Sequence, residues 1–139
     1  MRERDRVRGE LLGFLSAAAE EARLIRECER PEEAFLRTHL RKYVLAKFLL
    51  PEGSVESEGI RDLIEASLAR MMQAAPELVE ELDTARSCAG ATSAMVKKAL
   101  LFQAMEREFG IELPARETAA AADIPALARL VLRAKVEGK

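Results

Sequence analysis

The chain has 139 residues, of which 49% are hydrophobic and only 4% aromatic, and its formal net charge at pH 7 is −2. A chain of this length can bury enough apolar surface to fold without a metal or a disulfide. The near-neutral charge excludes the strong basic excess that is typical of nucleic-acid-binding domains. Cys28 and Cys88 lie far apart and lack metal-ligand spacing, which argues against a zinc site and fits a reducing compartment.

The N-terminal segment contains arginines followed by the apolar run LLGFLSAAA, an order that signal peptides also have. Here acidic residues are interleaved with the arginines, and no segment reaches the roughly 20 apolar residues of a membrane span. We therefore expect a soluble cytoplasmic protein with no membrane span. The apolar positions instead follow one face of a helix. They are Val7, Leu11, Phe14, Leu15, Ala18, Ala22 and Ile25.

Two helices are predicted in the first 50 residues. The first runs from about Arg4 to Cys28 and ends before Pro31, because proline cannot continue a helix interior. The second runs from about Pro31 to Leu50. The short link between them predicts an antiparallel helical hairpin. The apolar face of the second helix repeats at four-residue spacing, at Leu36, Leu40, Val44 and Phe48.

The polar stretch that begins at Pro51 and ends at Gly59 is the best internal boundary. It separates an N-terminal helical hairpin extension, residues 1–52, from a helical bundle, residues 58–139. The bundle starts with a helix over about 58–74, where apolar residues follow the i, i+3, i+4, i+7 rule. A long connection over about 75–92 comes next, in which residues 77–82 are compatible with one helical turn.

The next helix is predicted to begin near Ser93, which can cap free N–H groups, and to end at Phe109. Gly110 is the expected residue just past its C-terminus. A short helix follows Pro114 in the stretch ARETAAAA, and Asp123 is expected to cap a last helix. The predicted fold class is all-α: three main helices and a short one, preceded by the hairpin.

Residues 58–137 resemble the acyl carrier protein family. The stretch EREFGIELP at residues 106–114 is similar to the end of the second main helix in that family, and the spacing from Pro114 to Ile124 matches the opening of its last helix. GIRDLIEASLARMM and CAGATSAM resemble its first helix and the entry to its second. The resemblance implies an acyl-carrier-like bundle that is not an enzyme and that docks to partner enzymes of acyl transfer.

The resemblance also implies a cofactor, 4′-phosphopantetheine, esterified to a serine in an Asp-Ser-Leu motif. Counted without a gap from Phe109, that serine falls on Met95, which has no hydroxyl. Alignment on GATS places it on Ser93 instead, with Thr92 in the position of the aspartate. Ser93 is therefore either an ordinary N-cap or a displaced attachment site at a helix N-terminus, where phosphate binds well.

The face that partners would contact in such a family carries Met95, Lys97 and Lys98 here. Lysines replace the acidic residues that carrier proteins generally present early in this helix, so the resemblance implies partners of different, acidic character. The alternative is that both lysines belong to an ordinary solvated face. His39 lies among basic residues without a paired nucleophile, which favours a solvated basic edge over catalysis.

Two alternatives to an acyl carrier stay open. The chain is either an acyl carrier or a structural or regulatory interaction module that keeps the carrier fold without the cofactor. In the second case the N-terminal hairpin would be the functional surface, and an exposed apolar stripe on it would favour a homodimer. An unrelated all-α ligand-binding bundle is the third alternative.

Overall fold

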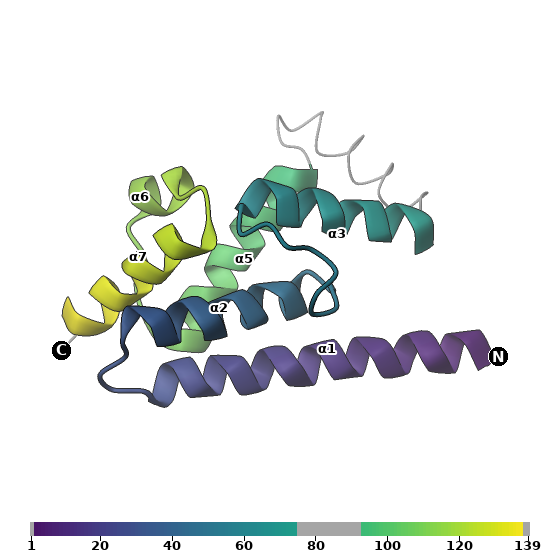
Figure 1. Cartoon of the computed structure of the whole chain (residues 1–139), viewed down its shortest axis with the longest axis horizontal. Coiled ribbons are helices and arrows are strands. Elements are labelled where there is room, and N and C mark those ends of the chain that lie inside the picture. Colours follow the sequence, from purple (N-terminus) through teal and green to yellow (C-terminus); the bar gives the residue numbers. More distant parts are fainter. Residues whose placement is uncertain (1, 75–92, 138–139) are drawn as a thin grey trace.

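The computed structural model describes residues 2–74 and 93–137, and within these ranges the chain is helical and has no β-strand. The predicted all-α class is confirmed for this part of the chain (Figure 1). The helical turn predicted at residues 77–82 lies outside the described residues. The helices are α1 (Arg2–Glu27), α2 (Glu33–Lys47), α3 (Ile60–Ala74), α5 (Ser93–Phe109), α6 (Ala115–Ala120) and α7 (Ile124–Glu137).

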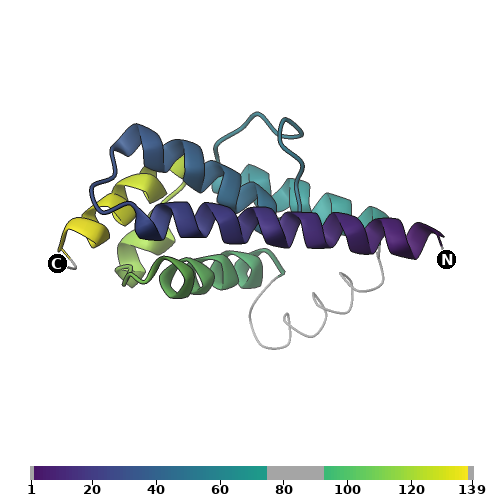
Figure 2. The same ribbon diagram turned by 90° about the horizontal axis from the view of Figure 1, so that it is seen from below.

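α1 and α2 form the antiparallel hairpin that the short link predicts (Figure 1). Ala18, Ala22 and Ile25 of α1 are buried, and the two small side chains allow the helices to approach closely. α2 begins at Glu33 and not at Pro31, which is buried ahead of the helix. With 26 residues against 15, α1 is longer by roughly 16 Å at 1.5 Å per residue. Its N-terminal part therefore extends past the end of α2 (Figures 1 and 2).

α2 ends at Lys47, three residues before the predicted end at Leu50. The cause is Leu49, which adopts a left-handed backbone conformation with φ of 59°. The Leu50 N–H donates to the Leu45 carbonyl at 2.8 Å and the Leu49 N–H to the Ala46 carbonyl at 3.1 Å. This is a Schellman motif, in which glycine is usual. The left-handed leucine costs about 1–2 kcal/mol, and burial of Leu50 offsets that cost.

Two predicted features after Phe109 are confirmed: the turn at Gly110 and the helix cap at Asp123. Gly110 has φ of 68°, and the N–H groups of Gly110 and Ile111 both donate to the Glu106 carbonyl at 3.1 Å. The chain therefore leaves α5 through the turn that only glycine adopts without strain. Asp123 caps α7, since its Oδ1 accepts a hydrogen bond from the Ala126 N–H at 2.9 Å.

The segments that enter α3 and α7 lie side by side. Gly59 and Asp123 form an isolated antiparallel β-bridge, so the N-termini of two helices that are far apart in the sequence are held together. Because backbone groups make this contact, it depends little on side-chain identity. Its hydrogen bonds run from the Ile60 N–H to the Ala122 carbonyl and from the Ile124 N–H to the Glu58 carbonyl, both at 2.9 Å.

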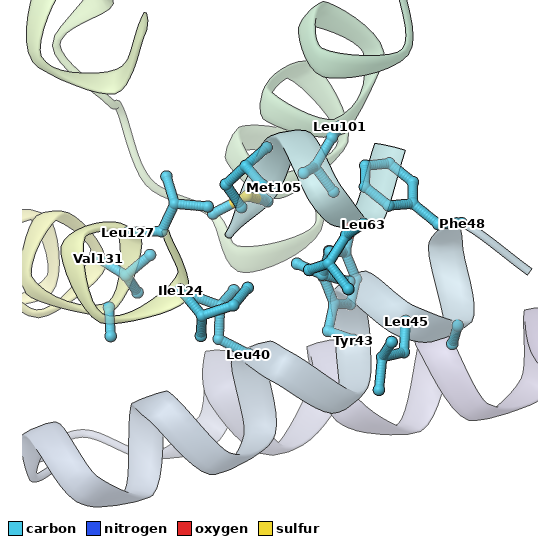
Figure 3. Close-up of a cluster of buried hydrophobic side chains, with 14 of the residues drawn as sticks. Leu40, Tyr43, Leu45, Phe48, Leu63, Leu101, Met105, Ile124, Leu127 and Val131 are labelled. Atoms are coloured by element: carbon cyan, nitrogen blue, oxygen red, sulfur yellow. The ribbon is translucent and has the colours of Figure 1, made fainter. Parts of the chain in front are cut away.

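The hydrophobic core surrounds α2, which packs against α1 on one side and α7 on another (Figures 1 and 2). Figure 3 shows Leu40 of α2 beside Ile124 of α7, with Leu127 and Val131 on the same helix. The core therefore contains side chains from both sides of the boundary predicted at the polar stretch from Pro51 to Gly59. Its largest fully buried members are Tyr43, Phe109, Ile25, Leu36, Leu40, Leu50, Ile60, Leu63, Met105, Ile124, Leu127 and Val44.

Candidate functional site

The predicted partner face lies on the first turns of α5. Met95 exposes 57% of its surface, so this position is accessible to another protein. Lys97 and Lys98 are half-buried, and each contacts another part of the same chain. The Lys97 ammonium lies 5.4 Å from the centre of the Phe48 ring. Lys98 donates to the Ala119 carbonyl at 3.0 Å, which joins α5 to α6.

Burial lowers the pKa of the Lys97 ammonium below its ordinary value of 10.5. The ring of Phe48 partly compensates for the lost hydration, because a cation is attracted to the face of an aromatic ring. Lys97 is thus a packing residue between α5 and the end of α2. The sequence indicated a solvated or a docking lysine, since its spacing does not reveal the aromatic ring that α2 supplies.

Ser93, the candidate attachment residue, is the first residue of α5, as predicted. Thr92 lies outside the described residues. A first helical residue has free backbone N–H groups beside it, and these favour a bound phosphate. Met95, the gapless alternative, is one half-turn further along α5 and has no atom that could form a phosphate ester.

His39 is not at a solvated edge, as the sequence indicated, but lies partly buried between α1 and α2. Its Nδ1 is 2.6 Å from Glu21 Oε2, and its ring centre is 4.3 Å from that of Phe35. This contact explains why a histidine without a nearby nucleophile occurs on α2: it joins the two helices of the hairpin. The sequence could not pair it with Glu21, which is 18 residues away.

A second polar contact that the sequence did not reveal joins α2 to the end of α5. Glu108 Oε2 accepts the hydrogen bond of the Tyr43 hydroxyl at 3.0 Å and lies 2.7 Å from the Lys47 ammonium. The rings of Tyr43 and Phe109 are 4.8 Å apart in a tilted arrangement. Desolvation, and then the neighbouring Glu108 charge, raise the pKa of the Tyr43 hydroxyl far above 10. This cluster joins the end of α2 to the end of α5.

The first half of α1 carries three exposed leucines. Leu12 and Leu15 expose 60% and 57% of their surfaces, and Leu11 exposes 40%. Within the predicted apolar stripe of α1, Leu11 and Leu15 are therefore exposed, whereas Ala18, Ala22 and Ile25 are buried where α2 lies alongside. Exposed leucines grouped on one helix are unusual for a surface and are typical of an interaction site.

Residues 2–74 and 93–137 contain no group of three or more histidine, cysteine, aspartate or glutamate side chains that could hold a metal ion. None of the helices in these ranges is long and apolar enough to cross a membrane. Comparisons of the chain with models of protein families, with curated proteins and with solved structures find no match.

Proposed function

We propose that the chain is a non-catalytic, acyl-carrier-like helical protein that acts through protein–protein contact, and that its partner on α1 is a second copy of itself. The observation that carries the proposal is the exposed apolar surface on the first half of α1, formed by Leu11, Leu12 and Leu15. All three side chains are exposed, and α1 extends past the end of α2 (Figure 2), so another molecule can approach this helix.

A second copy suits this surface for two reasons. A two-fold axis across α1 places each leucine group against its counterpart, which makes one apolar helix face self-complementary. The net charge of −2 gives two copies little mutual repulsion.

We expect wild-type protein to dimerise reversibly in sedimentation equilibrium, and the double substitution Leu12→Glu/Leu15→Glu to weaken the dimer about a hundredfold or more. Burial of a leucine contributes about 1.5–3 kcal/mol, and a hundredfold change in affinity corresponds to about 2.8 kcal/mol. The double substitution Ala119→Glu/Ala120→Glu is the control, since it adds the same two charges at exposed positions of α6, away from α1. A wild-type monomer at every concentration would exclude the second copy as partner.

The second candidate function is that of an acyl carrier with 4′-phosphopantetheine on Ser93. It is supported by the order of α5, the Gly110 turn, α6 and capped α7, and by the position of Ser93 as first residue of α5. The bound cofactor would supply a flexible thiol that carries an acyl group as a thioester. The chain itself would contribute the hydroxyl and the helix N-terminus that holds the phosphate diester.

For this candidate, incubation with coenzyme A and a broad-specificity phosphopantetheinyl transferase is expected to add the mass of one phosphopantetheine group. Intact-mass spectrometry measures the addition. In Ser93→Ala the addition should be absent, whereas Ser16→Ala, at an exposed serine of α1, should be modified like the wild type. An unmodified wild type, or modification that persists in Ser93→Ala, would leave the cofactor-less interaction module as the function.

A further inference from the structure

Two hollows of about 440 and 450 Å³ lie along α2, the first beside the segment that follows Leu50 and the second between α2 and α1. They share Lys42, Leu45 and Glu52 in their linings, so the two hollows adjoin at these residues. Each has a volume in the range of small-molecule sites, roughly 300–1,000 Å³. We call the two adjoining hollows together the α2 groove.

One end of the α2 groove is cationic. Arg37, Arg41 and Lys42 of α2 line it together with the Thr38 side chain, against two glutamates, Glu52 and Glu58. Arg41 is half-buried and donates to the carbonyls of Val55 and Ser57, which fix the guanidinium without neutralising its charge.

The carboxylates near this end leave much of the positive charge available. Arg37 has Glu58 at 3.6 Å, with 47% and 40% of the two side chains exposed, and solvent weakens such an ion pair. Glu52, the other carboxylate at this end, is exposed. In the described part of the chain, neither Arg41 nor Lys42 forms an ion pair with a carboxylate. Two half-buried cations without a carboxylate partner favour an anionic ligand.

The other end of the α2 groove is mainly apolar and lies between α1 and α2. Its charged side chains are Lys42 and Arg70 together with three glutamates, of which Glu21 is already paired with His39 at 2.6 Å. Glu10 and Glu52 are exposed. The apolar lining is formed by Phe14, Ala17, Leu45, Ala46, Leu50 and Pro51.

We infer that the α2 groove binds an anionic amphiphile, a long-chain carboxylate, with its head group at Arg41 and Lys42 and its chain on the apolar lining between α1 and α2. The alkyl chain of the ligand contributes affinity because it leaves water, at about 0.8 kcal/mol for each buried CH₂. The carboxylate is held by charge-assisted hydrogen bonds from the two cations. This inference does not depend on the proposed dimer, because a binding site within one copy needs no partner.

Gly13 gives the inference a precise test. It lines the apolar end of the groove, and a Cβ built on it meets no atom within 4 Å. A glycine inside a helix is less favourable than other residues by about 1 kcal/mol. Replacement by leucine therefore fills the groove from the α1 side while making the helix more stable.

We expect dodecanoate, below its micelle concentration, to bind the full-length wild-type chain saturably with one molecule per chain in isothermal titration calorimetry. Gly13→Leu should weaken binding at least tenfold, while thermal unfolding shows that the variant is folded and no less stable. Gly9→Leu is the matched control: Gly9 also lies on α1 with open space around it and does not line the groove. Its affinity should equal that of wild type.

The role of the ligand's head group is tested separately from that of its alkyl chain. Lys42→Met keeps most of the side-chain length, removes the charge, and should weaken dodecanoate binding several-fold. Dodecyltrimethylammonium, which has the same chain and the opposite charge, should not bind in the groove. The inference is wrong if dodecanoate does not bind saturably, if Gly13→Leu binds as wild type does, or if the cationic amphiphile binds equally well.

Discussion

Replacement of Leu40 by alanine is expected to lower the free energy of unfolding by about 2–5 kcal/mol, the usual range for a buried leucine. Leu40 is fully buried and lies beside Ile124 of α7 (Figure 3). The substitution leaves a cavity between the N-terminal hairpin and the last helix, since packed helices close such a space only in part. Chemical denaturation of the variant, followed by circular dichroism, measures the loss.

The control for this prediction is Leu12→Ala, which removes the same atoms from an exposed position of α1. In the monomeric state it should change stability by less than about 0.5 kcal/mol. Both the wild type and Leu40→Ala should unfold in one transition, because the core around α2 is shared by the hairpin and the later helices. Separate transitions, with Leu40→Ala affecting only the first, would contradict this account of the core.

Stability is expected to fall steeply above about pH 10 because of Tyr43. Its folded-state pKa is raised above the ordinary value of 10.0, mainly by desolvation. Above pH 10 the unfolded chain loses the phenolic proton and the folded chain keeps it, so the free energy of unfolding decreases by about 1.4 kcal/mol per pH unit. Below pH 10 this contribution is fully present. Tyr43 is the only tyrosine of the chain, so phenolate absorbance reports it directly and should appear together with unfolding.

Tyr43→Phe is the matched variant for the alkaline transition. At neutral pH it should be less stable by about 1 kcal/mol, since the hydrogen bond to Glu108 is lost while Lys47 still pairs with that carboxylate. The wild-type advantage in stability should shrink and then reverse above pH 10.

Lys97 acts in the opposite sense, because its lowered pKa makes stability rise with pH up to about 10.5. That effect is common to both proteins and cancels in their difference. A phenolate that titrates near pH 10 in the folded protein would contradict the prediction.

The secondary structure was predictable where a local signal decides it. The Gly110 turn and the Asp123 cap depend on residues within one helical turn, and the link between residues 28 and 32 is too short for anything except a hairpin. The predicted end of α2 was wrong by three residues. Its apolar pattern continues to Leu50, and nothing in that pattern indicates that Leu49 takes a left-handed conformation.

The candidate site was less predictable than the helices. Met95, Lys97 and Lys98 are on α5 as expected, but periodicity could not place the Lys97 ammonium over Phe48 or Lys98 on the Ala119 carbonyl. These contacts join segments that are 21 or more residues apart. For the same reason, the α2 groove has no local sequence signature: it needs α1, α2 and the loop after Leu50 to come together.

The sequence by itself determined the helical class, the hairpin and the caps, because periodicity, proline, glycine and capping side chains act over a few neighbouring residues. Only the tertiary structure decided which part of each apolar stripe is buried. Leu11 and Leu15 satisfy the same helical pattern as Ala22 and Ile25, yet the first pair is exposed and the second buried. The physical reason is that burial requires a neighbour, and α2 lies only along the second half of α1.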